Sequence, residues 1–331
     1  MLLGRLLFGL GNETLYIALL VGIAQWFHLG GGALAIALFF SMSRVGSYSA
    51  NKSTSWFADA YAQGWQAPLW LAAGLTATGV VTALIYYAID KRLPHLRAAG
   101  QKSERFVLKD LTGFSRSFWY ILWLNVLFAS VFFPFRSTFS IQYFQDVKGM
   151  NLADAGTANS YVFAAAIFAA PVFGLIADRI GRRASLLTFA AALMPLTFLI
   201  LATTDYGLWV TTILMGISFS VIPAVIWPST AMLVEKHRIG TAFGLINMIQ
   251  SIGLAAVNYA AGHLNDTFAA GKDNPEGYDA MLIMFAALSM VTFVSTVLLL
   301  IRERQQPGDG IEARVVGEEV RVPGRHRHEG W

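Results

Sequence analysis

The chain has 331 residues, of which 56% are hydrophobic and 13% are charged, and its formal net charge is +4. Soluble domains carry about 25% charged residues, so this composition excludes an ordinary water-soluble protein and indicates a membrane protein. The sequence has no cysteine, which excludes disulfides, thiolate metal sites and cysteine nucleophiles.

Long apolar runs in the sequence predict the membrane-spanning helices. A hydrocarbon core about 30 Å thick is crossed by about 17 to 25 helical residues. Runs of about this length occur at nine places: 1–27, 33–58, 68–90, 117–138, 155–177, 184–203, 207–231, 239–264 and 279–301. They are about twice as long as a barrel strand and do not alternate polar with apolar residues. We therefore predict an all-α, polytopic membrane protein with nine spans.

The first span carries a glutamate, Glu13, and the second carries an arginine, Arg44. An ionisable group at bilayer depth costs at least about 2.5 to 3.5 kcal/mol, which makes both residues candidates for function. By helical rise on antiparallel helices, they lie within about 10 Å of the same depth. We expect them to share one cavity as a substrate site. A structural ion pair is the alternative.

Polar residues recur on the second span at steps of three and four, so they share one helix face: Ser41, Arg44, Tyr48, Asn51 and Ser55. A weaker stripe follows the eighth span: Asn247, Gln250, Ser251 and Asn258. Such a stripe must face protein or water. We predict a central hydrophilic path in which Tyr48, Asn51, Asn247 and Gln250 bind substrate. Hydrogen bonding between helices, without transport, is the alternative.

Two further cations lie towards predicted helix ends. Lys52 is near the outer end of the second span, where a solvated role is as plausible as contact with substrate. Arg136 is about 30 Å along the fourth span by helical rise, and we expect it at the outer rim or at a gate.

Lysine and arginine predict the orientation. Segment 91–116 holds seven of them and is therefore expected in the cytoplasm. The outer loops hold only Arg136, Lys148 and Lys272. We predict an outer N-terminus, a cytoplasmic C-terminus and a disordered cytoplasmic tail at 302–331, which is rich in charge, glycine and proline.

The loop between the fifth and sixth spans reads GLIADRIGRR. Its order G-x-x-x-D-R-x-G-R-R resembles the loop motif of the major facilitator superfamily at every defined position, although any short cytoplasmic loop collects arginines. The motif residues are Gly174, Asp178, Arg179, Gly181, Arg182 and Arg183. They suit a cytoplasmic latch, in which Gly174 permits close helix approach, Gly181 allows a tight turn, and Asp178 pairs with the arginines in one conformation only.

In that superfamily the motif lies between the second and third helices of each six-helix half. The nine spans are therefore expected to correspond to helices 4–12 of a twelve-helix fold, with the first three absent from the chain. The implied domains are a partial amino-terminal half (1–90), a basic cytoplasmic linker (91–116), a carboxy-terminal half (117–301) and the tail. The superfamily's fourth-helix pattern R-x-x-x-G-x-G matches Arg5, Gly9 and Gly11, which are expected to serve gating or structure.

Several strings, including GRLLFGLGNETL, SMSRVGS and AGHLND, look like the lysosomal dipeptide transporter family of this superfamily. The resemblance covers nearly all of residues 1–301. It implies facilitated diffusion of dipeptides (uniport) by alternating access, with Glu13 and Arg44 holding the two ends of the peptide. It also implies an accessory membrane subunit as a partner.

A proton-coupled carrier of another small organic solute and a truncated, non-transporting remnant are the alternative functions. The sequence shows no metal-ligand spacing, phosphate-cradling loop, nucleophile elbow or basic nucleic-acid surface. We therefore predict no enzyme activity, cofactor, metal or nucleic-acid partner. The expected partners are a dipeptide and the lipid bilayer. Short loops without a sorting signal favour a bacterial inner membrane, and the lysosomal membrane is the alternative.

Overall fold

The computed structural model describes residues 2–26, 32–92, 113–180, 182–204, 208–234 and 238–305. At some helix positions within these ranges the side chain is not described, among them Arg5, Glu13, Asp178 and Arg179. The described residues form helices joined by turns, with one isolated bridge between Gly271 and Asn274 and no β-strand in these ranges. The predicted all-α class is confirmed.

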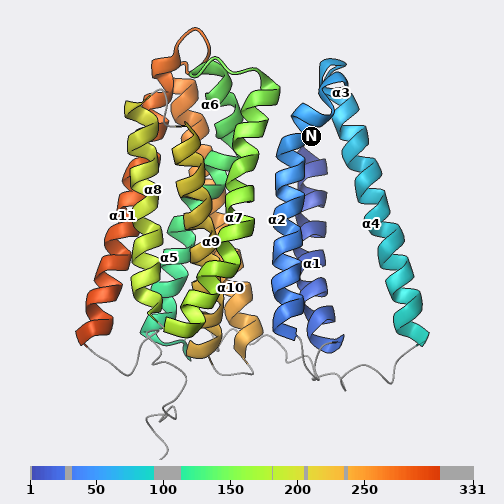
Figure 1. Cartoon of the computed structure of the whole chain (residues 1–331), viewed down its shortest axis with the longest axis vertical. Helices are drawn as coiled ribbons and strands as arrows, with labels where there is room; N and C mark the ends of the chain where they lie inside the picture. The colour runs from blue at the N-terminus through green and yellow to red at the C-terminus, as the bar shows by residue number, and fades with distance from the viewer. Residues whose placement is uncertain are drawn as a thin grey trace, which may run out of the picture. The chain divides into compact units, whose positions relative to one another are not determined.

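Figure 1 shows the helices, coloured from blue at the start of the chain to red towards its end. They are α1 (Leu2–Trp26), α2 (Gly32–Trp56), α3 (Ala58–Ala62), α4 (Gln66–Arg92), α5 (Arg116–Phe133), η3 (Pro134–Phe139), α6 (Ser140–Asp146), α7 (Leu152–Ile180), α8 (Arg183–Thr203), α9 (Leu208–Leu233), α10 (Ile239–Thr267), η5 (Pro275–Tyr278) and α11 (Asp279–Gln305).

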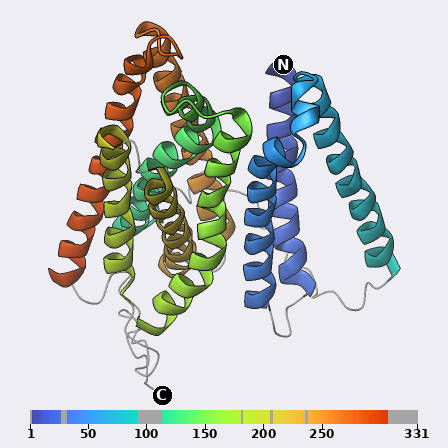
Figure 2. The same cartoon turned by 45° about the horizontal axis from the view of Figure 1, so that its top comes forward.

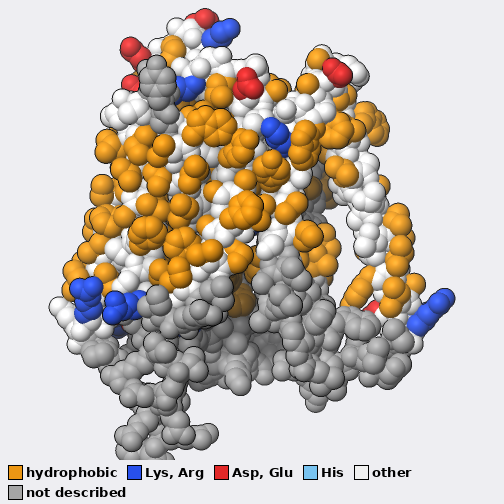
Figure 3. All heavy atoms as spheres, in the orientation of Figure 1, with side chains coloured by type: hydrophobic (Ala, Val, Ile, Leu, Met, Phe, Trp, Pro, Cys, Tyr) orange, Lys and Arg blue, Asp and Glu red, His pale blue; other side chains and the backbone are white. Residues whose placement is uncertain are grey.

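Each of the nine predicted spans coincides with one long helix, and the fourth continues through η3 and α6. Within the described ranges, seven helices are long and apolar enough to cross a membrane: Gln66–Arg92, Arg116–Asp146, Leu152–Gly174, Arg183–Thr203, Leu208–Trp227, Gly240–Thr267 and Pro275–Gln305. α1 and α2 are not among these seven; α2 carries the polar stripe, and parts of both helices lie outside the residues whose side chains are described. On the face shown in Figure 3, hydrophobic side chains cover the middle of the helices and most charged side chains lie towards the helix ends.

The chain divides into two compact units, Met1–Phe106 with Leu152–Ser160, and Val107–Asn151 with Tyr161–Trp331. The first unit contains α1 to α4 and the first turns of α7. Most of the predicted linker 91–116 and nearly all of the predicted tail 302–331 lie outside the described residues. The expected division into halves therefore stays a prediction.

α4 has no buried residue along its whole length. Large apolar side chains project from every part of it; Trp70 is 78% exposed and Leu75 is 73% exposed. A helix that is apolar all round is suited to the interior of a membrane rather than to water. The composition of α4 therefore agrees with its prediction as a membrane span.

α5 is the central helix of the second unit and contacts α9, α10 and α11. The ring of Phe132 on α5 stacks on Phe219 of α9, with centroids 4.2 Å apart. Just beyond the end of α5, the ring of Phe135 lies 5.2 Å from Phe198 of α8 and 5.7 Å from Phe285 of α11. α8 runs beside α11 in both views (Figures 1 and 2). Aromatic packing thus joins α8, α9 and α11 to α5 and the segment that follows it.

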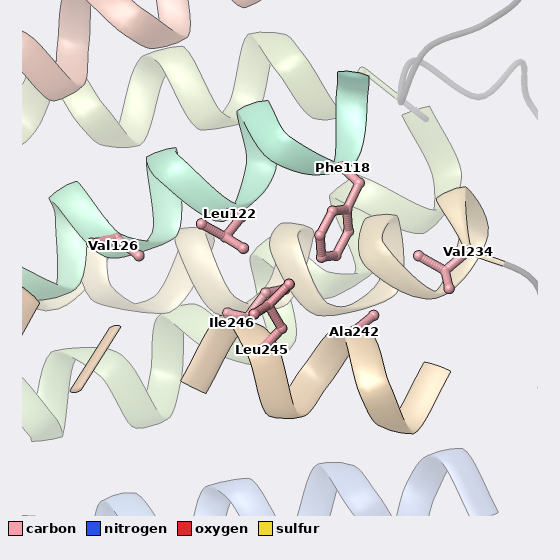
Figure 4. Close-up of a cluster of buried hydrophobic side chains, with 7 residues drawn as sticks. All are labelled: Phe118, Leu122, Val126, Val234, Ala242, Leu245 and Ile246. Carbon is pink, nitrogen blue, oxygen red and sulfur yellow. The ribbon is translucent and has the colours of Figure 1, made fainter. Parts of the chain in front are cut away.

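The opposite end of α5 packs on α10 through a cluster of buried hydrophobic side chains (Figure 4). The cluster there consists of Phe118, Leu122, Val126, Val234, Ala242, Leu245 and Ile246. Further along the same contact, a Cβ added to Gly253 of α10 would lie 2.6 Å from the Oγ of Ser130 and 2.9 Å from a methyl carbon of Val126. Close helix approach in membranes uses small residues in this way. Gly253 therefore sets the spacing of α5 and α10.

A π-helix, η3, interrupts the regular winding where α5 ends. Its first residue is Pro134, which has no backbone N–H to donate and so disturbs the α-helical hydrogen-bond pattern. Arg136 lies in this segment and is only 3% exposed, with its guanidinium 5.8 Å from the ring centroid of Phe144. The structure thus buries this side chain against an aromatic ring, and its expected place at the outer rim or at a gate stays a prediction.

Candidate functional site

The rings of Tyr16, Phe39 and Phe40 place α1 against α2. The Tyr16 ring centroid lies 5.5 Å from that of Phe39 and 6.4 Å from that of Phe40. The two helices are consecutive and antiparallel, so one turn back from Tyr16 on α1 is level with about one turn beyond Phe40 on α2. Those two positions are Glu13 and Arg44. The backbone register thus agrees with the predicted matching depth of the two charges.

Arg44 is 8% exposed, although it lies on a helix that otherwise exposes much of its surface. Tyr16 lies close enough to it for an electrostatic interaction. The side chain of Glu13 lies outside the described residues, so the predicted pair stays a prediction. A buried guanidinium on the polar face of a membrane helix is an anion-binding group, because its five N–H donors fit a carboxylate.

The stripe on α2 continues from Arg44 towards the end of the helix. Tyr48 is half-buried, and its ring packs edge-on against Trp56 with centroids 6.2 Å apart. Asn51 is also half-buried, and its Nδ2 donates to the backbone oxygen of Ser47 at 2.8 Å. The structure keeps these residues on one side of α2, as their spacing predicts.

The last turns of α2 meet the first turns of α7 through polar side chains. The Nδ2 of Asn159 donates to the Oδ1 of Asn51 at 2.5 Å, and the Nζ of Lys52 donates to the Oγ1 of Thr157 at 2.9 Å. All of these residues belong to the first unit. We call this contact the α2–α7 clasp; its residues are Asn51, Lys52, Thr54, Gly156, Thr157 and Asn159.

Gly156 lets the two backbones approach within the clasp. A Cβ added there would overlap the Oγ1 of Thr54 and lie 2.8 Å from the backbone oxygen of Asn51. That oxygen also accepts the Oγ1 hydrogen of Thr54 at 3.0 Å. Rotating side chains cannot relieve an overlap with backbone, so only glycine fits at this position.

The predicted stripe on α10 pairs with α5 and η3. The Nδ2 of Asn125 donates to the Oε1 of Gln250 at 2.6 Å, and the Oγ1 of Thr138 donates to the Oδ1 of Asn258 at 2.9 Å. The backbone oxygen of Asn247 accepts the Ser251 hydroxyl at 2.9 Å. Gln250 and Asn258 thus make the interhelical hydrogen bonds that the sequence left open as an alternative. A role in substrate binding for Asn247 and Gln250 stays a prediction.

The motif GLIADRIGRR lies at the end of α7 and the start of α8. Arg182 is exposed, and Arg183 is buried as the first residue of α8. Among the described residues, none lies within 4 Å of a Cβ added to Gly174, and the close helix approach expected there stays a prediction. The side chains of Asp178 and Arg179, and all of Gly181, lie outside the described residues.

The fourth-helix pattern falls on α1. Gly9 and Gly11 are exposed, and a Cβ added to either would meet nothing within 4 Å. The side chain of Arg5 is outside the described residues. The structural or gating role of these three residues therefore remains a prediction.

Sequence reasoning missed the α7 side of the clasp. The string AGTANS contains Gly156, Thr157 and Asn159; its only signal was polarity in the first turns of a span, where polar residues ordinarily mark the start of a helix. It also missed the burial of Arg136. Within the described ranges no group of three or more His, Asp or Glu side chains is placed to hold a metal ion.

Comparison with known proteins relates the whole chain to transporters. The sequence profile of the family described as Major Facilitator Superfamily matches residues 1–258 and, in a second match, residues 149–324. The lysosomal dipeptide transporter MFSD1 of Gallus gallus is 30% identical over 319 residues, which are 92% of this chain and 70% of that protein. The proteins of the same name from Danio rerio and Homo sapiens are both 28% identical, over 92% of this chain and 66% of their own length. The chain thus spans about two thirds of the length of these relatives.

Proposed function

The chain belongs to the major facilitator superfamily, and from that premise we propose that it carries dipeptides across a membrane by alternating access, as a uniporter. The observation that carries this proposal is Arg44, a buried cation on the polar face of α2 at the depth of Glu13. The similarity to proteins named lysosomal dipeptide transporters supports the choice of substrate.

The two charges suit the two ends of a dipeptide. A zwitterionic dipeptide presents an ammonium group and a carboxylate separated by up to about 7 Å, whatever its side chains. Arg44 is proposed to bind the carboxylate with two parallel hydrogen bonds, and Glu13 the ammonium. The burial of Arg44 strengthens its contact relative to water. This arrangement binds the two charged ends of the dipeptide backbone and tolerates different side chains.

Transport is proposed to proceed by rocking of two halves, 1–90 and 117–301, around this site. The segment from Gly174 to Arg183 is proposed as the latch that closes the cytoplasmic side when the outer side is open. The protein is a multi-pass membrane protein, and we propose a bacterial inner membrane with the C-terminus in the cytoplasm.

Uptake of a labelled dipeptide into vesicles reconstituted with the full chain tests this function. Wild-type protein should fill the vesicles to the external concentration, without stimulation by an imposed pH gradient. Arg44→Ala and Glu13→Gln should each abolish uptake, whereas Arg92→Ala, which removes an exposed cation at the end of α4, should not. Unchanged uptake in both site variants would refute the site, and accumulation driven by a pH gradient would refute uniport.

A further inference from the structure

We propose that the α2–α7 clasp is the outer gate of the Arg44 site. In this assignment the clasp closes the route to Arg44 from the predicted outer side, and the hydrogen bonds of Asn159 to Asn51 and of Lys52 to Thr157 break when that side opens. The proposal rests on the proposed function, because a gate needs a site behind it.

The position of the clasp on α2 is the first support. Asn51 lies seven residues beyond Arg44, which is two helical turns and about 10 Å further along the same face. That direction is the predicted outer one. The first turns of α7 cover this part of α2, and Asn159 is only 1% exposed. A solute that follows the polar stripe inward to Arg44 therefore meets the clasp first.

The chemistry of the clasp is the second support, because it suits a contact that opens and closes. Hydrogen bonds between helices in membranes are individually weak, and water replaces them at little cost. Lys52 donates to a neutral hydroxyl, that of Thr157. Its ammonium group is therefore free to exchange Thr157 for water near the membrane surface.

The third support is the contrast with the α5–α10 contact. There a buried aliphatic and aromatic cluster accompanies the hydrogen bond between Asn125 and Gln250, so separation would expose a core. In the clasp, the nearest neighbours of a Cβ added to Gly156 are the side chain of Thr54 and the backbone oxygen of Asn51, and the hydrogen bonds join polar side chains. The clasp is thus closely fitted when closed, and water can take the place of its polar contacts when it opens.

A cross-linking experiment tests whether the clasp must open. The chain has no cysteine of its own, so Asn51→Cys with Asn159→Cys introduces the only thiols. Oxidation, or a short bifunctional thiol reagent, should join α2 to α7 and lower dipeptide uptake at least about tenfold, with recovery on reduction. For each single-cysteine variant, the same treatment should leave uptake at that variant's own untreated rate. Uptake that survives complete cross-linking would overturn the proposal.

A labelling experiment tests the gate without any dipeptide. Ser47→Cys places a thiol one turn inward of Asn51, and a membrane-impermeant maleimide is added from the outer side. Adding Gly156→Ala should raise the labelling rate at least about threefold, the factor equivalent to one interhelical hydrogen bond. Gly46→Ala is the matched control, since a Cβ there meets nothing within 4 Å. Asn159→Ala, which adds no volume, should raise the rate in the same direction.

The two experiments separate the failure of the gate from the failure of the proposed function. If the wild type moves no dipeptide while labelling still responds to Gly156→Ala and Asn159→Ala, the gate stands and the dipeptide assignment fails. If dipeptide uptake is normal and neither variant changes the labelling rate, the gate is wrong.

Discussion

Replacing Arg44 by alanine should remove the ability to distinguish a dipeptide from its C-terminal amide. The amide keeps the ammonium group and both side chains but loses the negative charge that Arg44 is proposed to bind. Arg44 is 8% exposed. Its guanidinium and a carboxylate are both charged, and hydrogen bonds to charged groups are worth about 1.5 to 3 kcal/mol. At about 1.4 kcal/mol per factor of ten, the wild type should prefer the free acid by about 10- to 150-fold.

The measurement is competition against binding of a labelled dipeptide to the purified protein, with half-inhibiting concentrations determined for the dipeptide, its amide and its N-acetyl derivative. In Arg44→Ala the acid and the amide should compete equally in whatever dipeptide binding remains. The penalty for N-acetylation should persist, because it reports on Glu13. Arg44→Lys should restore part of the preference, since lysine keeps the charge without the planar fork of donors. An Arg44→Ala protein that still prefers the acid by tenfold would refute carboxylate binding at this residue.

Three predictions concern packing in the second unit. Gly253→Ala should destabilise the purified protein by about 1 to 3 kcal/mol, because the new Cβ would lie 2.6 Å from a serine hydroxyl of α5. Gly244→Ala on the same helix has open space around the new Cβ and should leave the melting temperature unchanged. Equal melting temperatures for the two variants would contradict this packing. Phe132→Ala removes a ring with no exposed surface and should cost about 3 to 5 kcal/mol in denaturant unfolding; a cost under about 1 kcal/mol would disagree with its burial. Replacing Asn125 and Gln250 by leucine, singly and together, should give a coupling energy of about 0.6 kcal/mol and at most about 1.7; zero coupling would mean that the two amides act separately.

The long helices were predictable because apolar run length alone determines whether a segment can span a bilayer. The matching depth of Glu13 and Arg44 also follows from counting residues on two antiparallel helices. The contact of Tyr16 with Phe39 and Phe40 supports that count through the register of α1 and α2. Local spacing was sufficient here because the two helices are adjacent in the chain.

The clasp was not predictable because its partners lie more than 100 residues apart in sequence. Nothing in the local pattern of Thr157 or Asn159 identifies α2 as the neighbour. The polar stripe on α10 shows the same limit, that a local pattern does not identify the neighbouring helix. Its spacing correctly placed Gln250 and Asn258 on a polar face, but only the packing shows that this face meets α5 and η3.

The π-helix at Pro134–Phe139 has a consequence for how the fourth span is interpreted and engineered. One residue more per turn rotates everything after it by about 100° about the helix axis, relative to an uninterrupted α-helix. A helical wheel drawn over 117–146 therefore assigns the wrong directions to side chains beyond Pro134. Deleting a single residue from this segment would restore regular winding and leave the side chains of α6 facing their present partners, whereas regular winding without a deletion would turn them away.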